Sequence, residues 1–296
     1  MTRSFPPDVV VLDSDSLIHA RVGLGRKEMQ ILQAKSYALR DDVFAFGVVT
    51  PQLQNEAVFA DVLRRMKLET GRWDKVSLLL PDAWFRINII ELQSLPERPA
   101  EAAEVIRWSL RRTMPVDPSA LRLSYEVLSR TPPRILVVSA VEATLASIER
   151  LFEAAGIEIV LIEPVGLNIW NAVTAREAVT TRDRIFFYIR EHDFTTVLFR
   201  GAQPLFIRSR NLDGERTLQQ EIKISATYLR DTLQTTSIEN CYVAGNGIDG
   251  SVTDAISSEF SAPVRRIALR DVAEQTPGDA SAYEAELTAA TGVFTG

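Results

Sequence analysis

The feature of this sequence that most constrains its fold is an order of secondary-structure elements that occurs twice. In each half, three short apolar segments with the β-branched and aromatic residues typical of strands are followed by an amphipathic helix and one more strand. In the first half these elements are predicted at Val9–Leu12, Leu17–Val22, Glu28–Ala38, Glu56–Lys67 and Val76–Leu80. In the second half they are predicted at Arg184–Ile189, Thr195–Arg200, Pro204–Arg210, Thr217–Leu233 and Asn240–Ala244. Such a repeat predicts two α/β lobes of similar topology.

The segments around these repeats have recognisable ends. Asn55 is a predicted cap for the first helix, and Gly156 is a predicted left-handed terminator of a later one. The further predicted elements are a helix at Val141–Ala155, a strand at Ile157–Ile162, and helices at Val165–Ala178, Val252–Glu259 and Tyr283–Val293. The pattern breaks around Val179–Asp183, so the predicted domains are residues 1–179 and 180–296.

A third segment, Leu95–Leu128, interrupts the first half. Its helical part carries an apolar stripe at spacings of three and four, and its last part alternates like a strand with one apolar face. The stripe consists of Ala103, Ile106, Leu110 and Met114, and the strand face of Leu121, Leu123, Tyr125 and Val127. Because longer α/β runs lie on both sides, we expect one helix and one strand to form an inserted subdomain over about residues 82–130. Ile135–Ala140 is then predicted to be a core strand of the first lobe.

The composition is that of an ordinary soluble globular protein. Apolar residues make up 46% of the chain and charged residues 24%, and the formal net charge of −6 gives no basis for binding nucleic acid. The single cysteine, Cys241, excludes an intramolecular disulfide. The longest apolar runs, such as Val43–Val49, are far shorter than the roughly 20 residues that cross a bilayer, and the N-terminus does not read as a signal peptide. We therefore expect a cytoplasmic protein without direct membrane insertion.

The order of motifs in the inserted segment resembles PilM, the actin-like family of type IV pilus assembly proteins. The similar features are Leu95-Pro96-Glu97, the Ile106-Arg107-Trp108 helix, Met114-Pro115, and the strand that ends at Tyr125-Glu126-Val127-Leu128. The resemblance implies an α/β actin-like (ribonuclease H-like) duplicated fold of two lobes. It also implies that the final helix packs back on the first lobe.

In the actin-like family, two hairpins cradle the phosphates of ATP through backbone amides, and an aspartate orients Mg²⁺. By this resemblance, Asp13 matches the aspartate of the first hairpin and Ser16 a serine that contacts phosphate, but Asp15 replaces the glycine. In the second hairpin, alignment of the strands puts Phe187 on the aspartate and Ile189 on the glycine, and neither could serve. A shifted alignment would offer Asp193, which has no glycine beside it.

The residues expected to face the adenosine are better retained. Glu221 and Ser225 match the pattern Glu-Ile-x-x-Ser-x-x-Tyr, and the loop Gly245, Asn246 and Gly247 is similar to a Ser-Gly-Gly-Gly loop of the family. Glu163 resembles an acidic position of the family and equally fits a solvated residue. A glycine turn after a strand is also often only a turn.

The remaining chemistry-bearing residues favour structural roles. His19 and His192 have no cysteine or carboxylate cluster at ligand spacing, so no metal site is expected. Trp84, Trp108 and Trp170 are expected to be core or subdomain-interface aromatics. Asp13 and Asp15 could form an acid–base pair, but carboxylates in a tight turn are more often solvated.

The resemblance implies a cytoplasmic adaptor, peripheral to the inner membrane, that binds the tail of a PilN-like membrane protein and other pilus assembly proteins. The loss of glycine from both hairpins predicts a pseudo-ATPase with no catalytic residues and no cofactor. One alternative is an active ATPase that binds ATP and Mg²⁺ through Asp13, Ser16 and the Gly245 loop. Another is the cytoplasmic part of a GspL-like type II secretion protein, which shares the fold.

Overall fold

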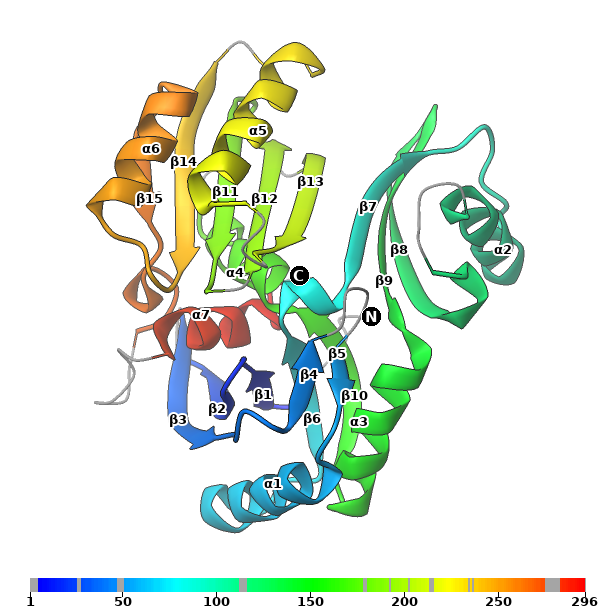
Figure 1. Cartoon of the computed structure of the whole chain (residues 1–296), viewed down its shortest axis with the longest axis vertical. Helices are drawn as coiled ribbons and strands as arrows, with labels where there is room; N and C mark the ends of the chain where they lie inside the picture. The colour runs from blue at the N-terminus through cyan, green and yellow to red at the C-terminus, as the bar shows by residue number, and fades with distance from the viewer. Residues whose placement is uncertain are drawn as a thin grey trace.

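Two lobes, each built on a five-stranded sheet, make up the body of the protein (Figure 1). The structure is a computed structural model that describes residues 5–25, 28–46, 51–111, 116–177, 180–191, 193–201, 203–212, 216–233, 235, 237–274 and 283–295. In spatial order, the sheet of the first lobe contains β10 (Glu158–Pro164), β6 (Lys75–Leu80), β1 (Asp8–Leu12), β2 (Ser16–Leu24) and β3 (Met29–Ala38). That of the second lobe contains β13 (Gln203–Asn211), β12 (Asp193–Arg200), β11 (Asp183–Ile189), β14 (Ile238–Gly245) and β15 (Val264–Arg266).

The two sheets have the same topology. In each, the first three strands are consecutive and antiparallel, and the fourth pairs in parallel with the first. The fifth strand, β10 or β15, then extends the parallel part. The actin-like duplicated fold predicted from the repeated order of elements is therefore confirmed.

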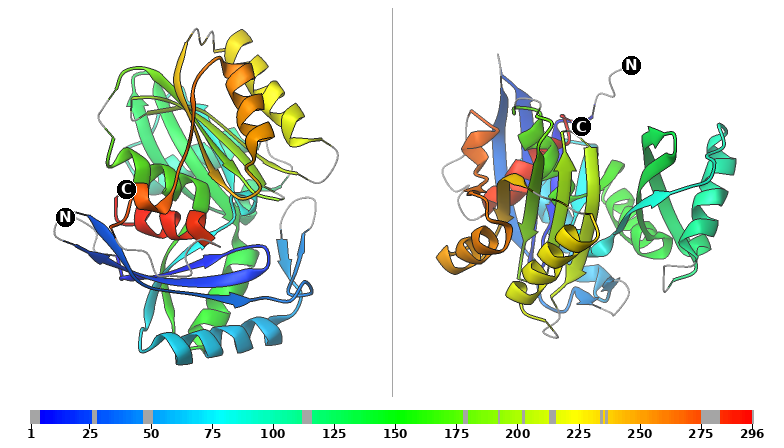
Figure 2. Two further views of the ribbon diagram at one scale, coloured as in Figure 1. Left: turned by 90° about the vertical axis from the view of Figure 1, so that its left-hand side faces the viewer. Right: turned by 90° about the horizontal axis from the view of Figure 1, so that it is seen from above.

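Two helices cover the outer face of each sheet, and two more lie between the sheets. The outer helices are α1 (Glu56–Thr70) and α3 (Glu142–Ala154) in the first lobe, and α5 (Leu218–Asp231) and α6 (Gly250–Phe260) in the second. The helices between the sheets are α4 (Val165–Thr174) and α7 (Glu284–Gly292), and a side view shows α7 in this middle layer (Figure 2). Successive residues of a central strand therefore pack into different cores, as Val9 and Val10 do. This explains why these strands read as continuous apolar runs.

Local sequence signals set the ends of the outer helices. The Asn55 side chain accepts a hydrogen bond from the backbone N–H of Val58, which caps α1 as predicted. Gly156 follows α3 with a φ of +70°, the left-handed conformation predicted for it. At the start of α5, Thr217 and Gln220 form a reciprocal capping box. The α4 helix ends at Thr174, before the predicted Ala178, which lies outside the described residues.

In its described residues, the inserted subdomain contains three strands and one α-helix, more than the predicted one helix and one strand. Its sheet has the order β7 (Arg86–Glu91), β9 (Pro133–Val141), β8 (Leu121–Arg130), and α2 (Pro99–Leu110) packs on it. The prediction that Ile135–Ala140 is a strand of the main body is wrong, because β9 pairs with β7 and β8. Seen from above, this subdomain stands to one side of the lobes (Figure 2).

The apolar stripe predicted for α2 is largely correct. Ile106 and Leu110 are fully buried, but Ala103 is only partly buried and Ala102 takes its place in the buried stripe. Met114 lies outside the described residues. Trp84 and Trp170 are buried as expected. The expectation for Trp108 is wrong: its side chain leaves the buried stripe and is 65% exposed.

Five short elements complete the described part of the chain. A two-stranded hairpin, β4 (Phe44–Phe46) with β5 (Pro51–Leu53), lies before α1. The other three are single turns of 3₁₀-helix. The first, η1 (Asp82–Trp84), follows β6, the second, η2 (Pro118–Ala120), precedes β8, and the third, η3 (Leu269–Asp271), follows β15. Of these, η1 matters most for the site described below, because it joins the first lobe to the inserted subdomain.

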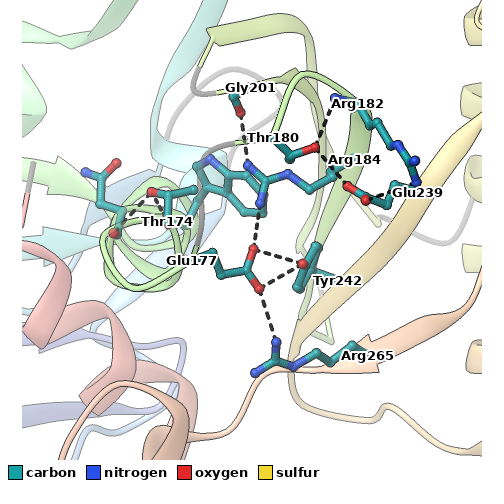
Figure 3. Close-up of polar contacts among 11 residues, drawn as sticks. Thr174, Glu177, Thr180, Arg182, Arg184, Gly201, Glu239, Tyr242 and Arg265 are labelled. Carbon is teal, nitrogen blue, oxygen red and sulfur yellow. Dashed lines mark hydrogen bonds and ion pairs between the residues drawn. The ribbon is translucent and has the colours of Figure 1, made fainter.

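A polar network fixes the connection between the lobes, just after α4 (Figure 3). Glu177 accepts hydrogen bonds from Arg184, from the Tyr242 hydroxyl and from Arg265, at 2.6, 2.8 and 3.1 Å. The buried Arg184 guanidinium also donates to the Gly201 carbonyl at 3.0 Å. Glu177, just after α4, is thus bound to the sheet of the second lobe by charge-assisted hydrogen bonds.

Candidate functional site

The β1–β2 and β11–β12 turns meet at the boundary between the lobes. The last paired residues of each hairpin enclose Asp13–Ser16 in the first lobe and Arg190–Asp193 in the second. Arg190 therefore has the place in the second lobe that Asp13 has in the first. Both turns follow the first strand of their sheet, which is where the duplicated topology brings equivalent residues face to face.

This register corrects the predicted alignment of the second hairpin. Phe187 and Ile189 do not occupy the positions of a phosphate-binding aspartate and glycine. They are instead buried in the core of the second lobe, beside α5 and α6. The shifted alignment that offers Asp193 as the aspartate also differs from the observed register, in which Asp193 has the place that Ser16 has in the first turn.

A buried ion cluster centred on Arg190 connects the two turns. The Arg190 guanidinium forms ion pairs with the carboxylates of Asp13 and of Glu286, which α7 contributes. The side chains of Arg190, Asp13 and Glu286 are only 10%, 15% and 2% exposed, so little solvent screens these pairs. Burial opposes the charged guanidinium, but Tyr188, Asp13 and Asp193 outweigh it and raise the pKa of Arg190.

Two further carboxyl groups, Asp82 of η1 and Asp193 of β12, lie beside this cluster. Burial raises the pKa of Asp82 to about 6. Burial, together with the charges of Asp82 and Asp13, raises the pKa of Asp193 to about 7, against the opposing effect of Arg190. The backbone N–H of Ala83 has a small opposing effect on the pKa of Asp193. Four acidic groups thus lie in or beside the Arg190 cluster, and the pKa values of two of them are raised to about 6 and about 7.

Asp82 also closes the N-terminal end of α4. Its Oδ1 accepts a hydrogen bond from the Gly166 backbone N–H at 2.8 Å, where the helix dipole favours negative charge. A Cβ on Gly166 would overlap the Asp82 carboxylate. Nearby, the Glu163 carboxylate accepts a hydrogen bond from Asn168 Nδ2 at 2.9 Å, and burial raises the pKa of Glu163. Glu163 therefore lies at the lobe boundary, with a partner from the first lobe.

Glu221 and Ser225 lie elsewhere, between α5 and β13, and are held by Arg208. Arg208 Nη1 is 2.5 Å from the Glu221 carboxylate and 3.4 Å from Ser225 Oγ. The Ser225 hydroxyl donates to the Glu221 carbonyl at 2.8 Å. Both side chains are buried, and their described contacts are to residues of the second lobe.

The Gly245–Gly247 turn is packed against the end of β11. A Cβ on Gly245 would overlap the Ile189 carbonyl, and its φ is +119°, so a side chain is excluded twice. The backbone N–H of Asn246 donates to the same carbonyl at 3.0 Å. Gly247 has a φ of +68° and open space around it. These glycines are therefore explained by the path of the backbone beside Arg190.

A groove separates the inserted subdomain from the first lobe. It has a volume of about 220 Å³. The residues that line it are Phe85, Arg122, Leu123, Ser124, Val138, Ser139, Ala140, Leu145, Glu149 and Ile159–Ile162. Two of the lining strands, β8 and β10, are the outermost strands of their sheets. Arg122 lies at its charged side and pairs with Glu149 at 2.5 Å and Glu142 at 2.6 Å.

The residues that link these features were not predicted from the sequence. Arg190, Asp82, Glu286 and Arg208 are charged residues in or beside apolar segments, and each is buried or nearly so. A charge inside a predicted core segment is a usable signal, because buried charges need partners. The partners themselves cannot be identified from that signal, since Asp13 and Arg190 are 177 positions apart.

Among the described residues, no group of three or more histidine, cysteine or acidic side chains is arranged to hold a metal ion. His19 stacks on Trp73 and hydrogen-bonds Asp8, while His192 lies outside the described residues. No helix in the described part of the chain combines the length and apolar character needed to span a bilayer.

Comparison with known proteins identifies the fold. No family model and no curated protein matches the sequence. The solved structure of a PilM–PilN type IV pilus biogenesis complex matches 99% of this chain and 98% of its own, with a TM-score of 0.79 at 18% identity. A Bacteroides thetaiotaomicron protein of unknown function with an actin-like ATPase fold matches with a TM-score of 0.57 at 11% identity, over 90% and 91% of the two chains.

The cytoplasmic domain of EpsL, an inner-membrane component of the Vibrio cholerae type II secretion system, is also similar. It has a TM-score of 0.51 at 9% identity, over 85% of this chain and 93% of its own. Both sheets, the layer between them and the inserted subdomain are thus part of a known arrangement. The chain has the actin-like fold in its PilM-like form.

Proposed function

We propose that this protein is a PilM-like adaptor of a type IV pilus assembly complex, which binds the cytoplasmic tail of a PilN-like membrane protein. The observation that carries the proposal is the match over nearly the whole chain to the PilM–PilN complex. On this proposal the protein works in the cytoplasm, at the inner membrane, and reaches the membrane through its partner. The EpsL similarity supports a role in type II secretion less well, because that match is weaker.

The groove between the inserted subdomain and the first lobe is the proposed site for the tail. An extended peptide can add to the free edge of a sheet, where backbone hydrogen bonds provide affinity and side-chain pockets provide specificity. Here β8 and β10 offer such edges, and apolar side chains including Phe85, Leu123 and Leu145 form the lining. Arg122 adds charge at one side of the groove.

We further propose that the adaptor acts without hydrolysing ATP. A phosphate cradle needs backbone amides that phosphate oxygens can approach. At the equivalent place in the second lobe, Arg190 follows β11, and its guanidinium is paired with Glu286 and with Asp13, the residue expected to orient Mg²⁺. The residues present therefore do not fit a triphosphate and Mg²⁺. Similarly, the Glu221 carboxylate, which was expected to face the adenosine, is already paired with Arg208.

A calorimetric titration with a synthetic peptide of the PilN-like tail tests the adaptor role. Val160 lines the groove at a bulge of β10 and is 38% exposed, so Val160→Arg should fill the groove without removing core packing. We expect this variant to weaken binding at least tenfold. Leu68→Arg is the matched control, because Leu68 is an 85% exposed apolar residue of α1 that does not line the groove. Equal affinity of both variants and the wild type would exclude the groove as the binding site.

The same method tests the nucleotide part of the proposal. We expect no heat of binding for ATP–Mg²⁺ and no phosphate release above the protein-free rate. Micromolar binding together with phosphate release that Asp13→Ala abolishes would show the alternative, an active ATPase. That alternative relies on the Gly245 loop and on Asp13 and Ser16, which lie in the β1–β2 turn.

A further inference from the structure

The Arg190 cluster joins three parts of the chain that are distant in sequence. Asp13 belongs to the β1–β2 turn of the first lobe, Arg190 to the β11–β12 turn of the second, and Glu286 to α7 in the layer between them. A bound ligand between two lobes draws them together by contacting both. Here the Arg190 guanidinium of the second lobe contacts the first lobe and the layer between the lobes, without any bound ligand.

Burial makes this cluster sensitive to the loss of any charge. Removing one member of a buried ion pair leaves the other uncompensated, which is far more costly than losing an exposed pair. Without Arg190, the carboxylates of Asp13 and Glu286 would face each other, with Asp82 and Asp193 nearby, and none of the contacts described for them includes another cation. Repulsion among these groups would then favour separation of the two turns.

The cluster is physically continuous with the peptide groove through η1. On one side, η1 contacts the second lobe, because β12 and β13 pack on this turn. On the other side, Phe85 follows η1 directly and lines the groove. The β7 strand of the inserted subdomain starts at the next residue, Arg86. A displacement of the second-lobe turn would therefore move a wall of the groove.

We infer that the Arg190 cluster is a built-in latch that holds the lobes together without a bound ligand, and that η1 couples this latch to the groove. This inference rests on the proposed function for the role of the groove. With the latch closed, η1 and Phe85 are held in place and the groove is preorganised, which favours peptide binding. With the latch open, ordering that wall of the groove costs part of the binding free energy, so the affinity for the tail falls.

Arg190→Ala tests the latch, and two measurements separate its parts. Hydrogen exchange of the segments that contain Asp13 and Arg190 reports contact between the lobes, and calorimetry with the tail peptide reports the groove. We expect exchange at least tenfold faster in both segments and peptide binding at least fivefold weaker, a coupling of ordinary size. Asp13→Asn keeps the pair between Arg190 and Glu286, so it should change both measurements in the same direction but by smaller factors than Arg190→Ala. This variant replaces Arg190→Ala in the test if Arg190→Ala does not fold.

Arg200→Ala is the matched control, because Arg200 pairs with Asp183 at 2.7 Å entirely within the second lobe. It should leave both measurements unchanged. Faster exchange with unchanged affinity in Arg190→Ala would overturn the coupling, and unchanged exchange would overturn the latch. If the wild-type protein does not bind the peptide, the proposed function of the groove fails and the coupling with it, while the exchange rates still decide whether the latch exists.

Discussion

Replacing Asp193 by asparagine should stabilise the protein, and the gain should grow as the pH rises. Burial is the main reason that the pKa of this carboxyl is about 7 instead of 3.8. Between these two values the folded state holds a proton that the unfolded state has lost. Stability that depends on this proton is present at low pH and is lost as pH rises towards and through the folded-state pKa. An asparagine has nearly the same size and shape as the aspartic acid and carries no charge at any pH.

The expected size follows from the pKa shift of Asp193, from 3.8 to about 7. Because each pKa unit corresponds to roughly 1.4 kcal/mol, ionising this buried group costs about 4 kcal/mol at high pH. Between pH 5 and pH 8 the predicted change is smaller, about 2.5 kcal/mol, because part of the cost is already present at pH 5. The advantage of Asp193→Asn over the wild type should therefore increase by about that amount across this range.

Urea denaturation of the wild type and the variant at pH 5, 6, 7 and 8 measures this difference. Asp249→Asn is a suitable control, since Asp249 caps α6 and its pKa is lowered, chiefly by the Ser251 hydroxyl. Its contribution is present above the unfolded-state pKa and is lost only under acid conditions, so its difference should be flat from pH 5 to 8. A flat profile for Asp193→Asn as well would refute a raised pKa for the Asp193 carboxyl.

Three further predictions concern packing and are checked by the midpoint of chemical denaturation. Gly245→Ala should destabilise the protein by at least about 2 kcal/mol, because its Cβ would overlap a β11 carbonyl at a positive φ. Gly292→Ala should also destabilise the protein, because the new Cβ would overlap a carbonyl of α4. Alanine ordinarily stabilises a helix by roughly 1 kcal/mol relative to glycine, so a stabilised variant would contradict the close α4–α7 packing. Ile106→Ala, at a fully buried position of α2, should cost about 2–4 kcal/mol, whereas the exposed Trp108→Ala should stay within about 0.5 kcal/mol. Similar losses at these two positions would mean that Trp108 is covered in solution.

The sequence predicted local structure well where the signal is itself local. The cap at Asn55, the terminator at Gly156 and the recurring three strands, helix and strand all depend on residues within a few positions of one another. The duplicated fold follows from these elements, because the antiparallel hairpins and parallel fourth strand leave few alternative topologies.

Long-range partners could not be read in the same way. The strand β9 has the apolar pattern of a buried strand, and that pattern is equally compatible with the main sheet and with the sheet of the inserted subdomain. Trp108 follows the buried Ile106 by two positions, so it faces away from the stripe, and its aromatic character alone suggested the opposite. At the candidate site, Asp13 was identified by resemblance, but its partner Arg190 depends on how two lobes meet.

The position of α7 has a consequence for how the chain folds as it is synthesised. This helix packs on α4 and against β1, β2 and β3, so it completes the core of the first lobe, yet it follows every strand and outer helix of the second lobe in the chain. The first lobe therefore leaves the ribosome with an apolar face still uncovered, and that face must wait until the second lobe has been translated. During this interval the nascent chain is expected to need a chaperone, or to bury the face temporarily in a non-native contact.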